Sequence, residues 1–334
     1  MDICDIAKLA GVSSATVSRV INGMNNVKPS TADGVHRAIA EAKFYPNNNA
    51  TTLKRGKSLT YGLIIPDITN PFFPEFIRNF EHIMVERNRD MLMATTAFHA
   101  SRVQQSIRRM LIRRVDGVAL LASEIETEPI EALIHNRVPL VSMDRRLTGP
   151  GLSDVLIDYS SGMDEAIKHL KKLKHRRIGY IGGSVGPTIS DHRRSAFIEA
   201  MKNNGLKAEL ELIRPGNYRM QGGESAMAEL LSVKPHSTAV LAANDLTAIG
   251  ALRVTQNRSL TVPQDISIIG FDDIDLADIL QPPLTTLRLS RSALATTFFK
   301  ALEALQAEPH SSGRQYSAET KLVIRGSTAV ARTQ

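Results

Sequence analysis

The sequence predicts a small all-α head, residues 1–45, followed after a linker by a larger α/β body, residues 60–330. In the head, apolar side chains recur at helical spacing. From Thr60 onward, short apolar runs alternate with amphipathic stretches of helix length, a pattern typical of doubly wound parallel sheets. The 334 residues suffice for two to three domains of roughly 100–200 residues each.

Two short helices joined by a tight turn are predicted at the start of the head. Gly11 ends the first helix in a left-handed conformation, Ser13 caps the second, and Gly23 ends it. A turn this short makes the helices cross steeply, which is the helix-turn-helix geometry. One face of each helix is apolar: Ile3, Ile6, Ala7 and Ala10 in the first, and Val17, Val20 and Ile21 in the second.

A third helix is expected after Pro29. Ser30 and Asp33 have the spacing of a capping box at its start. Gly34 lies inside this helix and costs about 1 kcal/mol relative to alanine. The inward face of the helix consists of Val35, Ala38, Ile39 and Ala42.

The outer face of the second helix carries short polar side chains and one arginine. Such a surface fits deep into a DNA major groove, where Arg19 can reach O6 and N7 of guanine. The pattern is equally compatible with a three-helix bundle that has a solvated polar face. The residues on this face are Ser14, Ala15, Thr16, Ser18, Arg19 and Asn22.

The charge of the chain is concentrated near its N-terminus. The net charge is +7, and residues 1–60 contribute +4 of it through eight basic and four acidic residues. This distribution indicates a head that meets a polyanion, although a solvated charged face gives the same count. The single cysteine, Cys4, leaves no intrachain disulfide. With no apolar run long enough for a membrane span or a secretory signal, we expect a cytoplasmic protein.

Residues 46–59 are predicted to link head and body. Pro46 suits a helix start, but the asparagines and threonines that follow make a poor isolated helix. A segment of this kind is expected to become helical only when docked. A flexible polar linker is the alternative.

The body is expected to contain two sets of strands, before and after about Ser160, and therefore two α/β lobes. Ligands of such sheets bind beyond the carboxyl ends of the strands. The predicted strands are Tyr61–Ile65, Met91–Thr95, Gly117–Ala122, Leu140–Met143, Val155–Ile157, Ile178–Ile181, Ala239–Ala242 and Ile266–Phe271.

The loops after these strands mix aromatic, acidic, amide and guanidinium side chains. Aromatic rings can stack on the faces of a small polar ring, while carboxylates and guanidinium groups bind its hydroxyls. Ordinary turn chemistry explains any one loop equally well, so the hypothesis rests on their convergence. The loops are residues 66–73, 143–146, 182–193, 244–245 and 270–273.

At its N-terminus the chain closely resembles the DNA-binding head of the LacI family of bacterial transcription regulators. The resemblance lies in DIAKLAGVS at residues 5–13 and ATVSRVIN at residues 15–22. It implies that Ser14, Ala15 and Arg19 read bases, and that Thr16, Ser18 and Asn22 hold phosphates or orient the helix. It also implies a hinge helix within residues 46–59 that enters the minor groove, with Leu53 as an apolar wedge and Asn47, Lys54 and Arg55 as further DNA contacts.

The body is similar to the type I periplasmic sugar-binding fold of the same family. The shared motifs are PDITNPFF at residues 66–73, RVDG at 114–117, HRRI at 175–178, AND at 243–245, GFDD at 270–273, PLTT at 283–286 and RGST at 325–328. This similarity implies an N-lobe of residues 60–159 and 289–318 and a C-lobe of residues 160–288 and 319–330. Three crossovers would join the lobes.

The same similarity implies an effector site between the lobes, most like the site for a monosaccharide such as ribose. Leu289 stands where ribose binders place glutamine, which removes a polar contact. The implied effector-binding positions are Asn70, Phe72, Phe73, Asp144, Arg145, Arg193, Tyr218, Asn244, Phe271 and Asp272.

The predicted function is a sequence-specific DNA-binding regulator, a repressor that binds a pseudo-palindromic operator as a homodimer and responds to a sugar. The chain ends soon after its last motif, so a dimer is expected rather than a tetramer. No cofactor, metal or membrane partner is expected.

Two other functions are compatible with parts of the sequence. One is a periplasmic-type sugar-binding protein without a DNA role. The other is a serine hydrolase, because residues 182–186 fit the nucleophile-elbow pattern G-x-S-x-G; Pro187 follows directly, where a hydrolase helix should continue.

Overall fold

The computed structural model describes residues 1–24, 26–45, 57–121, 127–183, 189–308 and 311–332. Internal contacts divide the chain into two compact units, Met1–Ser58 and Leu59–Gln334. The predicted hinge contacts Asn47, Leu53, Lys54 and Arg55 lie outside the described residues, as does Ser184 of the elbow pattern.

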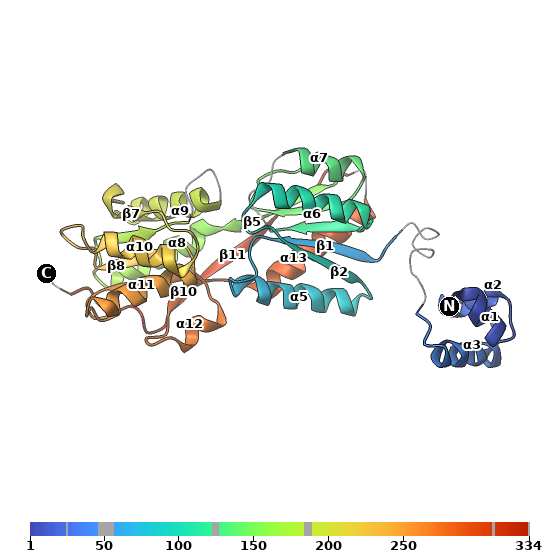
Figure 1. The fold of residues 1–334 in the computed structure, drawn as a ribbon. Coiled ribbons are helices and arrows are strands. Elements are labelled where there is room, and N and C mark those ends of the chain that lie inside the picture. The colour runs from blue at the N-terminus through green and yellow to red at the C-terminus, as the bar shows by residue number, and fades with distance from the viewer. Residues whose placement is uncertain (25, 46–56, 122–126, 184–188, 309–310, 333–334) are drawn as a thin grey trace. The chain divides into compact units, whose positions relative to one another are not determined.

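The head consists of three helices, α1 (Ile3–Leu9), α2 (Ser14–Ile21) and α3 (Pro29–Glu41) (Figure 1). Gly11 and Gly23 follow the first two helices with φ angles of 62° and 65°, a conformation that glycine adopts without strain. The predicted three-helix arrangement is confirmed. Its core is Ile6, Ala7, Val17, Val20, Val35 and Ala38.

Of the two predicted N-caps in the head, one is confirmed and one is wrong. Ser13 accepts a hydrogen bond from the Thr16 N–H at 3.2 Å, as expected. The predicted Ser30–Asp33 capping box is wrong: Lys28 is the N-cap residue of α3, and Ser30 lies inside the helix. Proline, with a fixed φ and no N–H, fits the first helical position, so α3 starts at Pro29.

A capping box exists instead at the start of α1. The Asp2 carboxylate accepts from the Asp5 N–H at 3.1 Å, and the Asp5 carboxylate accepts from the Asp2 N–H at 2.8 Å. The sequence pattern of this box was missed because aspartate replaces the usual glutamate at its second position.

One half of the body is built on five parallel strands in the order β2-β1-β3-β4-β5. Helices α5 and α13 pack together on one face, and α6 and α7 pack together on the other (Figure 1). The strands are β1 (Thr60–Ile65), β2 (Asp90–Thr95), β3 (Gly117–Leu120), β4 (Leu140–Met143) and β5 (Leu152–Asp158). The helices are α5 (Phe72–Glu86), α6 (Ala100–Ile112), α7 (Thr127–His135) and α13 (Arg291–Ala307).

The other half carries a second parallel set in the order β10-β9-β8-β6-β7. Helix α8 packs against α9, and α10 packs against α11. The strands are β6 (Ile178–Ile181), β7 (Ile213–Arg214), β8 (Ala239–Ala242), β9 (Ser267–Asp272) and β10 (Thr285–Leu289). The helices are α8 (Tyr159–Lys172), α9 (Ile189–Asn203), the 3-10 helix η1 (Leu210–Leu212), α10 (Met220–Leu230), α11 (Asp245–Asn257) and α12 (Asp275–Ile279).

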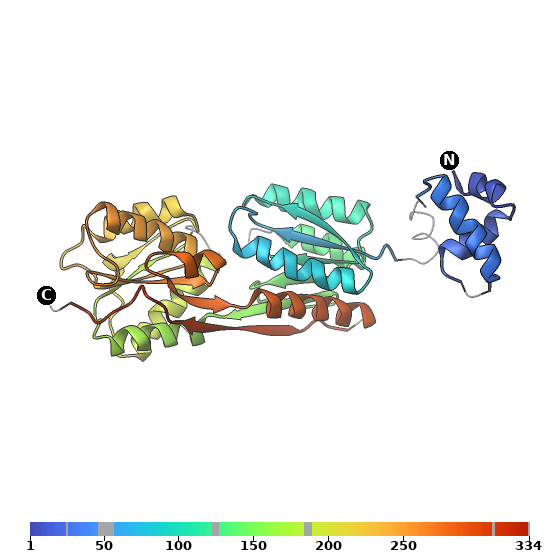
Figure 2. The ribbon, with the colours of Figure 1, turned by 90° about the horizontal axis from the view of Figure 1, so that it is seen from below.

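Strand β11 (Gln315–Val323) joins the two halves. Residues 315–319 pair in parallel with β5, and residues 320–323 pair antiparallel with β10. Figure 2 shows this strand extending from one half of the body into the other. The two-lobed α/β class is confirmed, but the lobes are not wholly parallel, because β11 runs back against β10. The limits given above for the two lobes stay predictions.

Candidate functional site

The first candidate site is the outer face of α2. Ser14, Ala15 and Arg19 are exposed on it, while Val17 and Val20 on the opposite face lie in the core of the head. The three side chains predicted to read bases therefore face away from the core. This face is free of bulky apolar groups that would keep a helix out of a major groove.

The other predicted residues of this face are engaged within the head. The hydroxyls of Ser13 and Thr16 lie 2.9 Å apart. Asn22 donates through Nδ2 to the Ser18 carbonyl at 2.6 Å. Thr16, Ser18 and Asn22 are half-buried, so these contacts fix both ends of the helix behind its three exposed side chains.

The second candidate site is the junction between the two halves of the body, beyond the carboxyl ends of the strands. Arg193, from α9, is the buried centre of this junction. Its Cζ lies 4.2 Å from the ring centroid of Phe271, 5.3 Å from that of Tyr159 and 5.6 Å from that of Tyr218. A desolvated cation–π contact is worth about 2 kcal/mol, so these three rings hold the guanidinium firmly.

Asp272 is the carboxylate that pairs with Arg193. Its Oδ1 lies 3.7 Å from a guanidinium nitrogen, and Arg193 also donates to the Ala243 carbonyl. Burial raises the pKa of Asp272 to about 7, and this rise is partly offset by Arg193 and Arg291. Burial acts to lower the pKa of Arg193, but Tyr159 and Asp272 raise it above its ordinary value, so the guanidinium stays charged.

Asn244 positions Tyr218 rather than only facing the junction. Its Nδ2 donates to the Tyr218 carbonyl at 2.9 Å, and its Oδ1 accepts from the Thr247 N–H at 2.9 Å as the cap of α11. Tyr218 has a φ of 60°. A Cβ atom at Gly183 would lie 2.2 Å from the Tyr218 ring. Close approach of Tyr218 therefore explains this glycine of the elbow pattern without any catalytic role.

Asp144 reaches the junction from the loop after β4. Its Oδ1 accepts from the Ile157 N–H at 3.2 Å, and its Oδ2 lies 3.6 Å from Nδ1 of His192 on α9. The Asp154 carboxylate accepts from the backbone N–H of Arg145 at 3.3 Å and of Arg146 at 2.7 Å, which fixes the shape of the loop.

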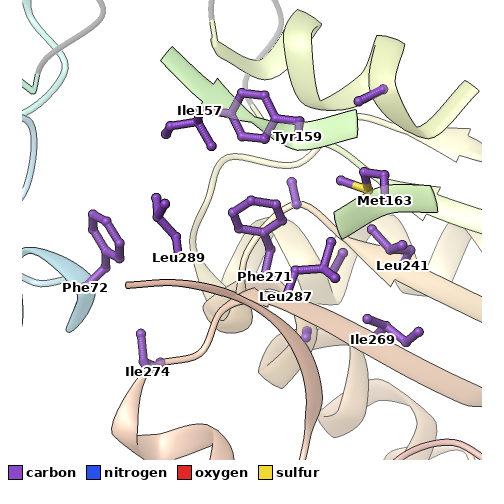
Figure 3. Packing of buried hydrophobic residues seen from close by; sticks show 14 of the residues in the cluster. Phe72, Ile157, Tyr159, Met163, Leu241, Ile269, Phe271, Ile274, Leu287 and Leu289 are labelled. Atoms are coloured by element: carbon purple, nitrogen blue, oxygen red, sulfur yellow. The ribbon is translucent and has the colours of Figure 1, made fainter. Parts of the chain in front are cut away.

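An apolar wall lies beside this polar cluster. Phe72 and Phe73 are buried, with ring centroids 5.3 Å apart, and Asn70 caps this turn by accepting from the Phe72 N–H at 3.0 Å. Figure 3 shows Leu289 between Phe72 and Phe271, with Ile157 nearby.

An ion pair and a hydrogen bond connect the two halves around the junction. Asp67 after β1 pairs with Arg219 before α10 at 3.0 Å. Glu75 of α5 pairs with Arg291, which also donates to the carbonyl of Asp272 at 2.7 Å. These contacts bring together segments far apart in the sequence.

The structure thus gathers Phe72, Asp144, Arg193, Tyr218, Asn244, Phe271 and Asp272 around one junction, with Asn70 and Arg145 on its bordering loops and Phe73 in the first turn of α5. Sequence reasoning missed Tyr159, His192 and the contacts that cross the junction. Asp67 and His192 belong to loops that the sequence predicts to lie at the site. Tyr159 lies at a strand-to-helix boundary, and nothing in the sequence marks it as a site residue.

Within the described part of the chain, no three histidine, cysteine or acidic side chains group as metal ligands. None of the described helices combines the length and apolar character that a membrane span needs.

Comparison with known families matches both parts of the chain. Residues 2–47 match the family described as bacterial regulatory proteins, lacI family. Residues 167–328 match the periplasmic binding protein-like domain.

Individual relatives cover nearly the whole length. The chain is 32% identical to the HTH-type transcriptional repressor CytR of Escherichia coli strain K12, over 97% of this chain and 95% of that protein. It is 34% identical to the ribose operon repressor of the same strain, over 97% of this chain and 98% of that protein.

Solved structures agree in fold. The Lac repressor dimer bound to operator and the anti-inducer ONPF superposes with a TM-score of 0.87, at 23% identity, over 98% of this chain and 99% of that one. A LacI family regulator from Enterococcus faecium with bound ribose gives a TM-score of 0.72 at 28% identity, over 82% of this chain and 100% of that one. With its helix-turn-helix head and two-lobed body, the chain belongs to the LacI family of bacterial DNA-binding transcription regulators.

Proposed function

We propose that this regulator is a cytoplasmic repressor that binds a pseudo-palindromic operator as a homodimer and is controlled by a monosaccharide bound between its lobes. The observation that carries the proposal is the buried Arg193, held among Tyr159, Tyr218 and Phe271 beside Asp272. A cation and a carboxylate among aromatic rings are the groups that recognise a polar sugar ring. The relatives named CytR and ribose operon repressor support the assignment as a repressor.

The operator contacts are assigned to the exposed face of α2 and to the hinge. Ser14, Ala15 and Arg19 read bases, and Thr16, Ser18 and Asn22 orient the helix and contact phosphates. In the hinge, residues 46–59, Leu53 inserts into the central base step while Asn47, Lys54 and Arg55 contact the backbone.

The effector site is assigned to the junction of an N-lobe, residues 60–159 and 289–318, and a C-lobe, residues 160–288 and 319–330. Arg193 and Asp272 bind hydroxyl groups, and Phe72 and Phe271 pack on the faces of the ring. Asn70, Phe73, Asp144, Arg145, Tyr218 and Asn244 complete the set. The structure of the Enterococcus faecium relative with ribose supports a sugar as the ligand class.

Effector binding controls the operator only if the effector's affinity differs between the DNA-bound and DNA-free protein. In this proposal, closure of the lobes on the effector changes the dimer interface and thereby the order of the hinge.

The experiment that tests the proposal measures operator and effector binding in the same variants. An operator selected from random duplexes is titrated by fluorescence anisotropy, and a panel of pentoses and hexoses is tested by thermal shift, since a ligand of the folded state raises its melting temperature. We expect Arg193→Ala to abolish the thermal shift and leave operator binding unchanged, and Leu53→Ala to do the reverse.

Arg194→Ala is the matched control, because Arg194 is the exposed neighbour of Arg193 on the same helix. It should behave as the wild type in both assays. A loss of operator affinity in Arg193→Ala with an intact sugar response would overturn the assignment of the two sites.

A further inference from the structure

Four buried polar atoms around Arg193 make no hydrogen bond to any described residue. They are Oη of Tyr159, Nδ1 of His192, Oδ2 of Asp144 and Nε of Arg193 itself. Native proteins leave few such groups, because each costs about 1–3 kcal/mol when it is desolvated without a partner. A cluster of four at one junction therefore indicates that something else satisfies them.

These atoms converge from both sides of the junction. His192 and Arg193 come from α9, Tyr159 begins α8, and Asp144 reaches across from the loop after β4. The 3.6 Å between Nδ1 of His192 and Oδ2 of Asp144 is longer than an N–H···O hydrogen bond. A group that donates to one atom and accepts from the other would join them.

Tyr159 adds a neutral hydroxyl to this cluster. Its ring packs against Phe271 with centroids 5.7 Å apart, in the position seen in Figure 3. Burial raises the pKa of Tyr159 well above its ordinary value, so the phenol keeps its proton. The hydroxyl faces Asp144 and Arg193, which respectively raise and lower the pKa of the phenol, and it can donate to or accept from a third group.

The chemistry of the unmet groups selects the ligand. Nε of Arg193 donates, Oδ2 of Asp144 accepts, and the tyrosine and histidine atoms do either. Hydroxyl groups, which donate and accept at once, satisfy this mixture. An anionic ligand would meet the buried carboxylate of Asp144, whose repulsion opposes its binding.

We propose that Tyr159 and His192 bind the effector directly, with Asp144, and that the effector is an uncharged polyhydroxy ring rather than a sugar phosphate or sugar acid. One ligand hydroxyl joins His192 to Asp144, and a second binds Tyr159 and Nε of Arg193. This inference rests on the proposed function, since it assigns further contacts to the same effector site.

The test uses the full-length protein and three probes: D-ribose, D-ribose 5-phosphate and D-ribonate. Titration calorimetry measures their affinity for the wild type and for Tyr159→Phe, which removes only the hydroxyl, and His192→Phe, which keeps a ring without polar atoms. Loss of one net hydrogen bond is worth roughly tenfold in affinity. We expect D-ribose to bind, each variant to bind it about tenfold more weakly, and the two anions to bind weakly or not at all.

Tyr180→Phe is the control for Tyr159→Phe. The Tyr180 hydroxyl is also buried without a hydrogen-bond partner among the described residues, but its ring stacks on Phe197 beneath α9. It should leave the affinity for D-ribose unchanged. The exposed His236 gives the matching control for His192.

The outcomes separate this inference from the proposed function. The inference is overturned if both variants bind D-ribose as tightly as the wild type. It is also overturned if either anion binds more tightly than D-ribose and Arg193→Ala abolishes that binding. In both cases the effector site itself stays in place. Failure of all three probes to bind the wild type contradicts the ligand class proposed here. If operator binding is then also unresponsive to the wider sugar panel, the proposed sugar control fails with it.

Discussion

The hydroxyl of Thr320 accepts a hydrogen bond from the backbone N–H of Gly162 at 3.2 Å and donates one to the Asp158 carbonyl at 2.6 Å. Thr320 lies in β11 where this strand changes partner from β5 to β10, and Gly162 lies in the first turn of α8. Two of the segments that cross between the halves of the body are thus fastened to each other at a single buried hydroxyl.

Gly162→Ala should therefore destabilise the body. A Cβ atom at this position would lie 2.3 Å from the Thr320 hydroxyl oxygen, which its two hydrogen bonds hold in place. Overpacking of this kind costs about 1–3 kcal/mol. Urea denaturation followed by far-UV circular dichroism measures the change in the free energy of unfolding. Gly149→Ala, where an added Cβ meets nothing within 4 Å, is the control and should stay within about 0.5 kcal/mol of the wild type.

Gly34→Ala should have the opposite effect on the head. Gly34 lies inside α3, and a Cβ atom there would meet nothing within 4 Å. Alanine loses less conformational freedom in a helix than glycine, so the free energy of unfolding should rise by about 1 kcal/mol. Amide hydrogen exchange of residues in α3 measures this locally. Faster exchange in the variant would show that Gly34 is needed for a reason other than space.

Arg19→Ala should weaken binding at one base position more than at the others. A bidentate arginine–guanine contact is worth about 1–3 kcal/mol of discrimination. Affinities for the selected operator and for single-base variants of it are compared at fixed salt. Arg37→Ala, which removes an exposed charge from α3, is the control for general electrostatics. An equal loss of affinity on every sequence would mean that Arg19 contacts phosphate only.

Asp272 should make the stability of the body depend on pH. The pKa of this carboxyl is about 7 in the folded protein against an ordinary value of 3.8, so between these values the folded state holds a proton that the unfolded chain has lost. The free energy of unfolding should therefore fall as the pH rises through this window, by up to roughly 1.4 kcal/mol per unit, and level off above it.

Asp272→Asn removes that titration. Its free energy of unfolding should fall less than that of the wild type between pH ~5 and ~8, as measured by urea denaturation at several pH values. Parallel curves for the two proteins would mean that Asp272 stays ionised throughout. Asp275→Asn is the control, since Asp275 is an exposed acid three residues along the chain.

Buried segments of the fold could be predicted from the sequence because their apolar runs are continuous. Strands β4, β6 and β8 begin and end where the pattern places them. Strand β7 has only two residues, and β11 alternates polar side chains along a largely exposed face, so neither carries an apolar run. Strand β10 has a partly polar sequence without a continuous apolar run, so the pattern predicts no strand there.

The candidate site was predictable where its residues follow strands and lie in motifs. Arg193, Phe271 and Asp272 lie together as expected. Tyr159 could not be assigned in the same way, because its role depends on α8 and α9 packing side by side, and a single sequence does not show which helices meet. The capping box at Asp2 could not be recognised from the sequence, because its second position is Asp5 where glutamate is usual.

Strand β11 is hydrogen-bonded to one half of the body along its first stretch and to the other half along its second, and this pairing restricts how the two halves can move. Sliding either half of the body along β11 would break a whole ladder, with β5 on one stretch or with β10 on the other. Rotation about the strand axis keeps both ladders and changes only the backbone torsions at Glu319 and Thr320, where the two ladders meet. Rotation is therefore the easiest motion of the two halves. A ligand bound between them would change the angle between the halves rather than shift one half along the other.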